Sequence, residues 1–310
     1  MTGTMLDFEQ LGETLAGGAV LSAGQLRDLV HSRDLIGLGM LAADARTRRH
    51  GTQGTFVRVE TVDVAALPGD AAASIPIEAG EVRVQGRPVS PAAAVAVVRR
   101  LAAVANVPVT GFALDDLTAL GAPLSETLRA LRGAGVTAIA TARIDRLDLA
   151  SLQAVADAGL AVQTVTLGTP VGGEDFLEAL ERLRSWQAAT GVVRACAPLP
   201  VETPAEHPTT GYDDMRHVAI ARLVLDNVAH VQAHWTRMGA KLSQSCLLFG
   251  ADDVDAVPAR DAMPHGPRRA ILEEVRRNVR AASLVPVERD GAFAPRESGA
   301  AATAVEAEQA

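Results

Sequence analysis

The sequence contains few cysteines, few aromatic residues and almost no lysine. Only two of its 310 residues are cysteines, aromatic residues make up 3%, and Lys241 is the single lysine. Two cysteines exclude a framework of several disulfides, and they exclude any metal site within this chain that needs three or more thiolates. The net charge of -8 and the lack of a basic face argue against a nucleic-acid partner.

Long apolar runs are also missing. No run approaches the roughly 20 residues of a membrane span, and the first ten residues lack the basic region of a signal peptide. We therefore expect a cytoplasmic protein without a membrane span. Hydrophobic residues make up 48% of the chain, which is too much for general disorder, and the length suits one large domain.

Both ends of the chain differ in composition from its middle. Ser22 and Gln25 form the pattern of a capping box, and Asp34 precedes a long helical stretch. We expect a helical segment over residues 1–52. Residues 291–310 are rich in Ala and Glu, and they predict a disordered tail.

Between residues 53 and 290, short apolar strands alternate with helices. The predicted strands are 55–64, 82–84, 107–112, 136–141, 160–167, 192–199 and 230–235, followed by two short segments, 251–257 and 284–290. The predicted helices are 91–105, 123–135, 149–159, 174–191, 212–227, 240–250 and 267–282. This alternation predicts a parallel sheet, and six to eight units in one domain favour a barrel over an open sheet. We expect an α/β fold: a TIM-like (βα) barrel of partial or irregular form after an N-terminal helical segment.

Several polar residues are expected near the carboxyl ends of the strands, where a barrel carries its binding site. They are Thr110, Thr141, Arg143, Thr166, His234, Asp252 and Asp253. Such a rim suits a small polar ligand. For Asp252 and Asp253, a solvated turn with helix caps is the alternative, because their spacing differs from that of an EF-hand loop.

Two pairs of residues spaced four apart are better explained by structure than by function. His230 and His234 lie on a predicted strand, where they would be about 13 Å apart, so we do not expect a shared metal ion. Arg222 and Asp226 lie on a predicted helix, where that spacing predicts a modest surface ion pair.

Three segments carry a resemblance to a known family. Residues 209–227 read TTGYDDMRHVAIARLVLDN, residues 230–255 read HVQAHWTRMGAKLSQSCLLFGADDVD, and residues 285–290 read VPVERD. In order and spacing they closely resemble the C-terminal half of a radical SAM subfamily that contains aminofutalosine synthase, dehypoxanthine futalosine cyclase and the FO synthases. The resemblance implies a βα barrel with an N-terminal helical segment and a link to menaquinone biosynthesis by the futalosine route.

The resemblance also implies a cofactor for which this chain lacks the ligands. In the family, a CxxxCxxC loop after the first strand holds a four-iron four-sulfur cluster that cleaves S-adenosylmethionine, and thiolates are the ligands of such clusters. Residues 65–81 read AALPGDAAASIPIEAGE and contain no cysteine. Cys196 and Cys246 lie in other units, where core packing explains them. We therefore expect no cofactor, and His265 is the only match to a family histidine in its region.

These observations leave three functions open. The first is a cluster-free relative of the menaquinone-pathway enzymes that binds a small molecule, another enzyme of that pathway or an intact radical SAM paralogue, without radical chemistry. The second is an enzyme with redirected non-radical chemistry in the barrel pocket, using His234, Asp252, Asp253 and Thr166. The third is a structural subunit paired with an intact paralogue. Perturbed ionisable groups in a pocket would favour the second, and radical SAM catalysis by this chain is least expected.

Overall fold

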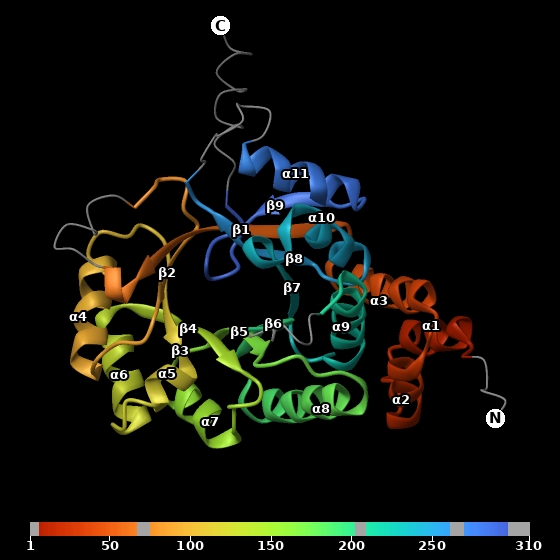
Figure 1. Ribbon diagram of the computed structural model, residues 1–310, viewed down its shortest axis with the longest axis horizontal. Helices are drawn as coiled ribbons and strands as arrows, with labels where there is room; N and C mark the ends of the chain where they lie inside the picture. The colour runs from red at the N-terminus through yellow and green to blue at the C-terminus, as the bar shows by residue number, and fades with distance from the viewer. Residues whose placement is uncertain (1–5, 67–74, 202–208, 261–269, 297–310) are drawn as a thin grey trace, which may run out of the picture.

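The computed structural model describes four stretches of the chain, which form an N-terminal helical segment and a βα barrel (Figure 1). These stretches are residues 6–66, 75–201, 209–260 and 270–296. Among these residues, no helix is long and apolar enough to cross a membrane.

Three helices precede the first strand: α1 (Phe8–Ala16), α2 (Ala23–His31) and α3 (Leu35–His50). The predicted capping box at the start of α2 is present, and the side chain of Asp34 accepts a hydrogen bond from the third residue of α3. Side-chain caps of this kind satisfy backbone N–H groups that a helix leaves unpaired. α3 packs along α9, so the segment is attached to one side of the barrel (Figure 1).

Eight parallel strands form the barrel. They are β1 (Gln53–Asp63), β2 (Glu81–Gln85), β3 (Val109–Ala113), β4 (Val136–Arg143), β5 (Val162–Leu167), β6 (Val193–Pro200), β7 (His230–His234) and β8 (Asp253–Pro258). Each strand pairs with the next, and β1 pairs with both β8 and β2. The predicted TIM-like barrel is confirmed, and it is closed rather than partial. Its irregularities are register shifts between β1 and β8, β3 and β4, and β5 and β6.

Helices cover the outside of the strands (Figure 1). They are α4 (Pro91–Ala102), α5 (Leu114–Thr118), α6 (Leu124–Ala134), α7 (Leu149–Asp157), α8 (Gly173–Thr190), α9 (Gly211–Val224), α10 (Trp235–Leu248) and α11 (Ile271–Ala281). All seven predicted barrel helices are found, and α5 is an additional one. α10 begins earlier than predicted and bends at Gly239, where φ is +74°.

A ninth strand, β9 (Val285–Glu288), pairs with the first residues of β1, which precede the residues of β1 that pair with β2. The chain then continues across the amino end of the barrel. Residues 291–296 therefore do not behave as the beginning of the expected tail, because Gly291 and Arg296 hydrogen-bond to the barrel. Residues 297–310 lie outside the described part.

The core lies between the strands and the helices, where side chains such as Ile139, Leu128 and Leu152 are completely buried. Burial of this apolar surface is the main stabilising contribution to such a fold. The inside of the barrel is different, because it contains buried charged side chains. These charges determine the properties of both barrel ends.

Candidate functional site

Three paired charges occupy the middle of the barrel. Arg83 on β2 donates to both carboxylate oxygens of Asp255 on β8 at 2.8 Å each, and to those of Glu81 at 2.8 and 3.0 Å. Burial alone would raise the pKa of Asp255, but the Arg83 guanidinium reverses this effect and holds that pKa well below its usual range. Arg83 and Asp255 are therefore charged together inside the protein, and the same guanidinium also supplies hydrogen bonds to the buried Glu81 side chain.

A second group of paired charges closes the amino end. Arg289, which follows β9, is 1% exposed and donates two hydrogen bonds of 2.6 Å to Asp253. Two residues further on, the carbonyl of Gly291 accepts hydrogen bonds from Gln163 and Arg194. A Cβ at Gly291 would lie 2.9 Å from Glu81 Cγ, so a side chain at this position would collide with the barrel. The C-terminal segment thus seals this end.

At the opposite end, a cavity of about 370 Å³ opens at the carboxyl ends of β1, β2, β7 and β8. Its walls include three charged side chains with partners: Arg83, described above, and the pair formed by Arg260 and Glu60, in which Arg260 donates at 2.7 Å. Four uncharged polar residues complete the polar part of the wall, and they are Thr61, Gln85, His234 and Thr236. The cavity therefore offers a ligand hydrogen bonds more than net charge.

His234, at the end of β7, is a titratable group of this cavity whose pKa is strongly shifted. Burial lowers its pKa to about 4, although the Asp255 carboxylate acts in the opposite direction. The imidazole is consequently neutral near pH 7, with one nitrogen able to donate and the other able to accept a hydrogen bond. Its Nδ1 lies 3.3 Å from the hydroxyl of Thr236.

The wall of this cavity also contains a strained residue. Ala256 on β8 has a φ of +56°, a conformation that residues with a Cβ seldom adopt. Ala256 lies in a bulge between two pairs of residues, Val254 with Phe56 and Val257 with Arg58. Between these pairs, β8 contains one residue more than β1 does. This bulge turns the end of β8, and such features are common next to binding sites.

The structure does not bring the predicted site residues together. His234 lies at the mouth, as predicted. Thr110 is buried inside the barrel and donates to Glu81 at 2.6 Å, and Thr166 is also buried. Thr141 is half-buried at the end of β4, and Arg143 pairs with Asp145 at 2.9 Å in a separate hollow of about 500 Å³. His265 lies outside the described residues.

The predicted position of Asp252 and Asp253 at the carboxyl rim is wrong. β8 begins at Asp253, so both residues lie at the amino end of the barrel. Aspartate is disfavoured in strands, which made this segment look like a polar turn. Here Arg289 neutralises Asp253, and an arginine from α9 neutralises Asp252, so tertiary pairing overrides the local preference.

That arginine is Arg222, and its predicted surface pair with Asp226 is also wrong. Arg222 is 3% exposed, and it donates hydrogen bonds to the Asp252 carboxylate and to the Gly250 carbonyl. Asp226 forms its ion pair with Arg184 instead. A signal was present in the sequence, because Arg222 interrupts an apolar stretch and a buried arginine needs a partner. Sequence reasoning also missed Arg83 and Gln85, since nothing in a short strand shows which of its polar side chains pair across a barrel or line a cavity.

Comparisons with known proteins agree with this architecture. Residues 202–301 match the family model described as the CofH/MqnC C-terminal region. The chain is 29% identical to the aminodeoxyfutalosine synthase of Thermus thermophilus over 203 residues, which is 55% of each protein. It is 31% identical to the cyclic dehypoxanthine futalosine synthase of Streptomyces coelicolor over 142 residues, 42% of this chain and 36% of that one.

A solved structure extends the likeness to nearly the whole barrel. Methylornithine synthase (PylB) superposes with a TM-score of 0.69 over 89% of this chain and 97% of its own, at 13% identity, which shows a shared fold. The alignments with the two curated relatives span about half the length of one and about a third of the other. The protein is therefore a TIM-like barrel that is distantly related to the radical SAM enzymes of the futalosine pathway.

Proposed function

We propose that this protein binds a polar metabolite of the futalosine route at the barrel mouth, without radical chemistry. The observation that carries the proposal is the connection between β1 and β2. It contains no cysteine between Asp63 and Glu81, while the cavity beside it has a wall of hydrogen-bonding groups. The ligand would be held by hydrogen bonds to its hydroxyl or amide groups.

The two cysteines of the chain do not fit a cluster held by three thiolates. Cys196 lies within β6 and Cys246 within α10, and both are buried. Burial raises the pKa of Cys196 to about 12 and raises that of Cys246 as well, so both are neutral thiols near pH 7. Cluster ligation needs thiolates. This supports a barrel that works without the family's cofactor.

The relatives suggest the class of metabolite. Their names include aminodeoxyfutalosine and cyclic dehypoxanthine futalosine, which are the natural probes for this cavity. Its volume of about 370 Å³ lies at the small end of the range for ligand sites. One polar portion of such a molecule, rather than the whole of it, would fill the space between Gln85 and His234.

Calorimetric titration with aminodeoxyfutalosine and cyclic dehypoxanthine futalosine tests the proposal. We expect saturable binding of at least one of them that is insensitive to salt, because paired charges contribute little net field. His234→Gln and Gln85→Ala should each weaken binding about tenfold, which corresponds to one lost hydrogen bond.

Arg87→Gln is the matched control, because Arg87 is exposed and lines the separate hollow near Arg143. It should leave the affinity unchanged. Weaker binding in Arg87→Gln with normal binding in His234→Gln would place the ligand in that other hollow. Lack of binding by both compounds would contradict the proposal.

The absence of radical chemistry has its own test. After anaerobic incubation with iron and sulfide, followed by addition of S-adenosylmethionine with dithionite as the reductant, we expect less than stoichiometric iron and no cleavage of S-adenosylmethionine. A cluster with four irons per chain, together with formation of methionine and 5′-deoxyadenosine, would refute this part of the proposal.

A catalytic role without radicals is the second candidate, favoured by the lowered pKa of His234. Groups with such shifts gather at active sites, and a neutral imidazole can accept a proton from a bound hydroxyl. Conversion of the bound metabolite, lost in His234→Gln, would support it.

An accessory role beside an intact radical SAM paralogue predicts instead that the two proteins purify together.

A further inference from the structure

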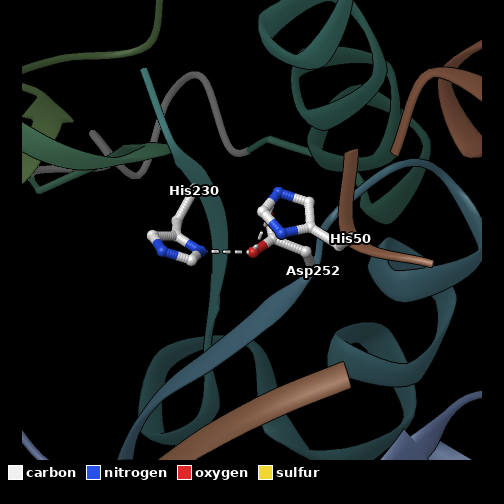
Figure 2. A group of neighbouring side chains, drawn as sticks. All are labelled: His50, His230 and Asp252. Atoms are coloured by element: carbon white, nitrogen blue, oxygen red, sulfur yellow. Dashed lines mark hydrogen bonds and ion pairs between the residues drawn. The ribbon is translucent and has the colours of Figure 1, made fainter. Parts of the chain in front are cut away.

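Two imidazoles and one carboxylate converge at the amino end of the barrel (Figure 2). His50 is the last residue of α3, His230 is the first residue of β7, and Asp252 immediately precedes β8. Both imidazole rings lie beside the Asp252 carboxylate (Figure 2). Three elements that are far apart in the sequence thus contribute one ligating atom each.

The distances between these atoms are close to those of a metal site. His230 Nδ1 lies 2.6 Å from Asp252 Oδ2, His50 Nε2 lies 3.6 Å from the same oxygen, and the three ligating atoms lie within 4.8 Å of one another. Two ligand atoms of a tetrahedral zinc ion are about 3.3 Å apart, given bonds of about 2.0–2.1 Å. Shifts of the side chains alone would therefore create the arrangement.

The surroundings fix the carboxylate and leave one side accessible. Asp252 Oδ1 accepts hydrogen bonds from Arg222 and from the backbone N–H of Val231, so Oδ2 is the oxygen that faces the imidazoles. Partners of this kind orient ligands in metal sites. The side chains of His50 and His230 are 17% and 19% exposed, against 2% for Asp252, so water can supply a fourth ligand.

We propose that His50, His230 and Asp252 bind one divalent transition-metal ion of the zinc class. Two imidazoles and one carboxylate are donors that suit Zn²⁺, Co²⁺ or Ni²⁺. Ca²⁺ and Mg²⁺ prefer six or more oxygen ligands and do not fit. The site lies at the opposite end of the barrel from the mouth cavity, so the inference does not rest on the proposed function.

Neighbouring charges limit how tightly the ion binds. Arg222 already balances the charge of Asp252, and the guanidinium of Arg46 lies close enough to interact with both. His50 also gives up its 3.0 Å hydrogen bond to the Ala229 carbonyl when its Nε2 binds metal. The site is therefore weaker than structural zinc sites built from several thiolates.

The bound ion would connect two parts of the fold. His50 belongs to the N-terminal helical segment, whereas His230 and Asp252 belong to the barrel. A ligand that binds only the folded state stabilises it. Metal binding therefore raises the midpoint of thermal unfolding, and the rise increases with metal concentration.

The test uses the full chain without a polyhistidine tag, freed of metal with a chelator and titrated calorimetrically with ZnCl₂. One equivalent should bind, and excess Mg²⁺ should not displace it. His50→Gln and His230→Gln should each weaken binding at least tenfold. His31→Gln is the matched control, because His31 is an exposed histidine of α2 that contacts Glu174, and it should bind like the wild type.

Co²⁺ gives a second measurement that needs no variant. Ligation by two imidazoles and a carboxylate in tetrahedral geometry produces a strong visible absorption band, whereas Co²⁺ in solution absorbs weakly. No Zn²⁺ binding by the wild-type chain, no such band, or equal affinity in the wild type and His230→Gln would each overturn the proposal. Binding at the barrel mouth is measured separately, so the two proposals can fail independently.

Discussion

The two ends of the barrel use charged residues in different ways. At the amino end, Arg289 and Arg222 are almost completely buried and each neutralises one aspartate, Asp253 and Asp252 respectively. At the mouth, the Arg260–Glu60 pair is more exposed, and uncharged groups such as His234 make up much of the remaining polar wall. Barrels generally keep stabilising residues at the amino end and ligand-binding residues at the carboxyl end.

This difference shows where a related barrel can change its chemistry. The amino end is held by buried pairs whose members depend on one another, so single changes there are costly. At the mouth, water can replace the contacts that exposed polar side chains make, so substitutions there cost little stability. The connection between β1 and β2, which contains no cysteine between Asp63 and Glu81, begins on the mouth side, so its sequence can vary while the amino end stays intact.

The largest expected effect is that of Arg289→Ala. The substitution leaves Asp253 buried without its guanidinium partner, although Thr55 and Gln232 still donate to it. We expect a loss of about 3–5 kcal/mol in the free energy of unfolding, measured with urea. Arg260→Ala at the mouth is the control and should cost less than about 1 kcal/mol. Equal losses would remove the distinction between the two ends.

The second prediction concerns acid. Burial lowers the pKa values of His217 and His234 to about 4, whereas an unfolded histidine has a pKa of about 6.5. The unfolded chain therefore takes up protons that the folded chain does not, and stability falls as the pH drops from about 6.5 to about 4. For both residues together we expect a loss of about 3–4 kcal/mol between about pH 7 and about pH 5.

Urea unfolding at a series of pH values measures this loss. His234→Gln should remove roughly half of the pH dependence, because the variant has no imidazole at the mouth to protonate. His31→Gln, at an exposed position, should retain all of it. A pH dependence that is the same in both variants would show that His234 is not the group responsible.

The fold was predictable to a greater extent than the site. The alternation of apolar strands with capped helices predicts the barrel, since period and capping are local properties of the sequence. Ser90 and Pro91, for example, start α4 as predicted, and Gly135 ends α6 in a left-handed conformation. Sequence alone could not show that residues 291–296 cross the amino end, because those contacts connect distant parts of the chain.

The site was harder to predict because its groups meet only in three dimensions. His234 could be placed, since it ends a strand and strand ends carry barrel sites. Asp252 could not, because its position depends on Arg222, which is 30 residues away in the sequence. His50 was overlooked for the same reason. It ends a helix of the N-terminal segment, and only the packing of α3 against the barrel brings it to His230.

A smaller effect is expected for Phe293, whose ring seals the amino end. It stacks on His230 with ring centroids 4.2 Å apart and covers the guanidinium of Arg289 at 3.8 Å. Phe293→Leu keeps an apolar side chain but loses both ring contacts, so we expect a loss of about 1 kcal/mol in urea unfolding. Phe293→Tyr retains the ring and should be close to the wild type. A loss in the tyrosine variant as large as in Phe293→Leu would show that the ring contacts contribute little.

The smallest effect is expected at the mouth, for Ala256→Gly. In most strand positions, replacing alanine by glycine costs about 0.5–1 kcal/mol because the unfolded chain gains freedom. At Ala256, where φ is +56°, glycine also removes strain of about 1 kcal/mol. The two effects offset each other, so the free energy of unfolding should change by less than about 0.5 kcal/mol.

Ala233→Gly, at a buried position on β7, is the comparison and should lose about 1 kcal/mol or more. Equal losses at the two positions would mean that Ala256 is not strained, and that the shape of the cavity at the mouth does not lower the stability of the protein.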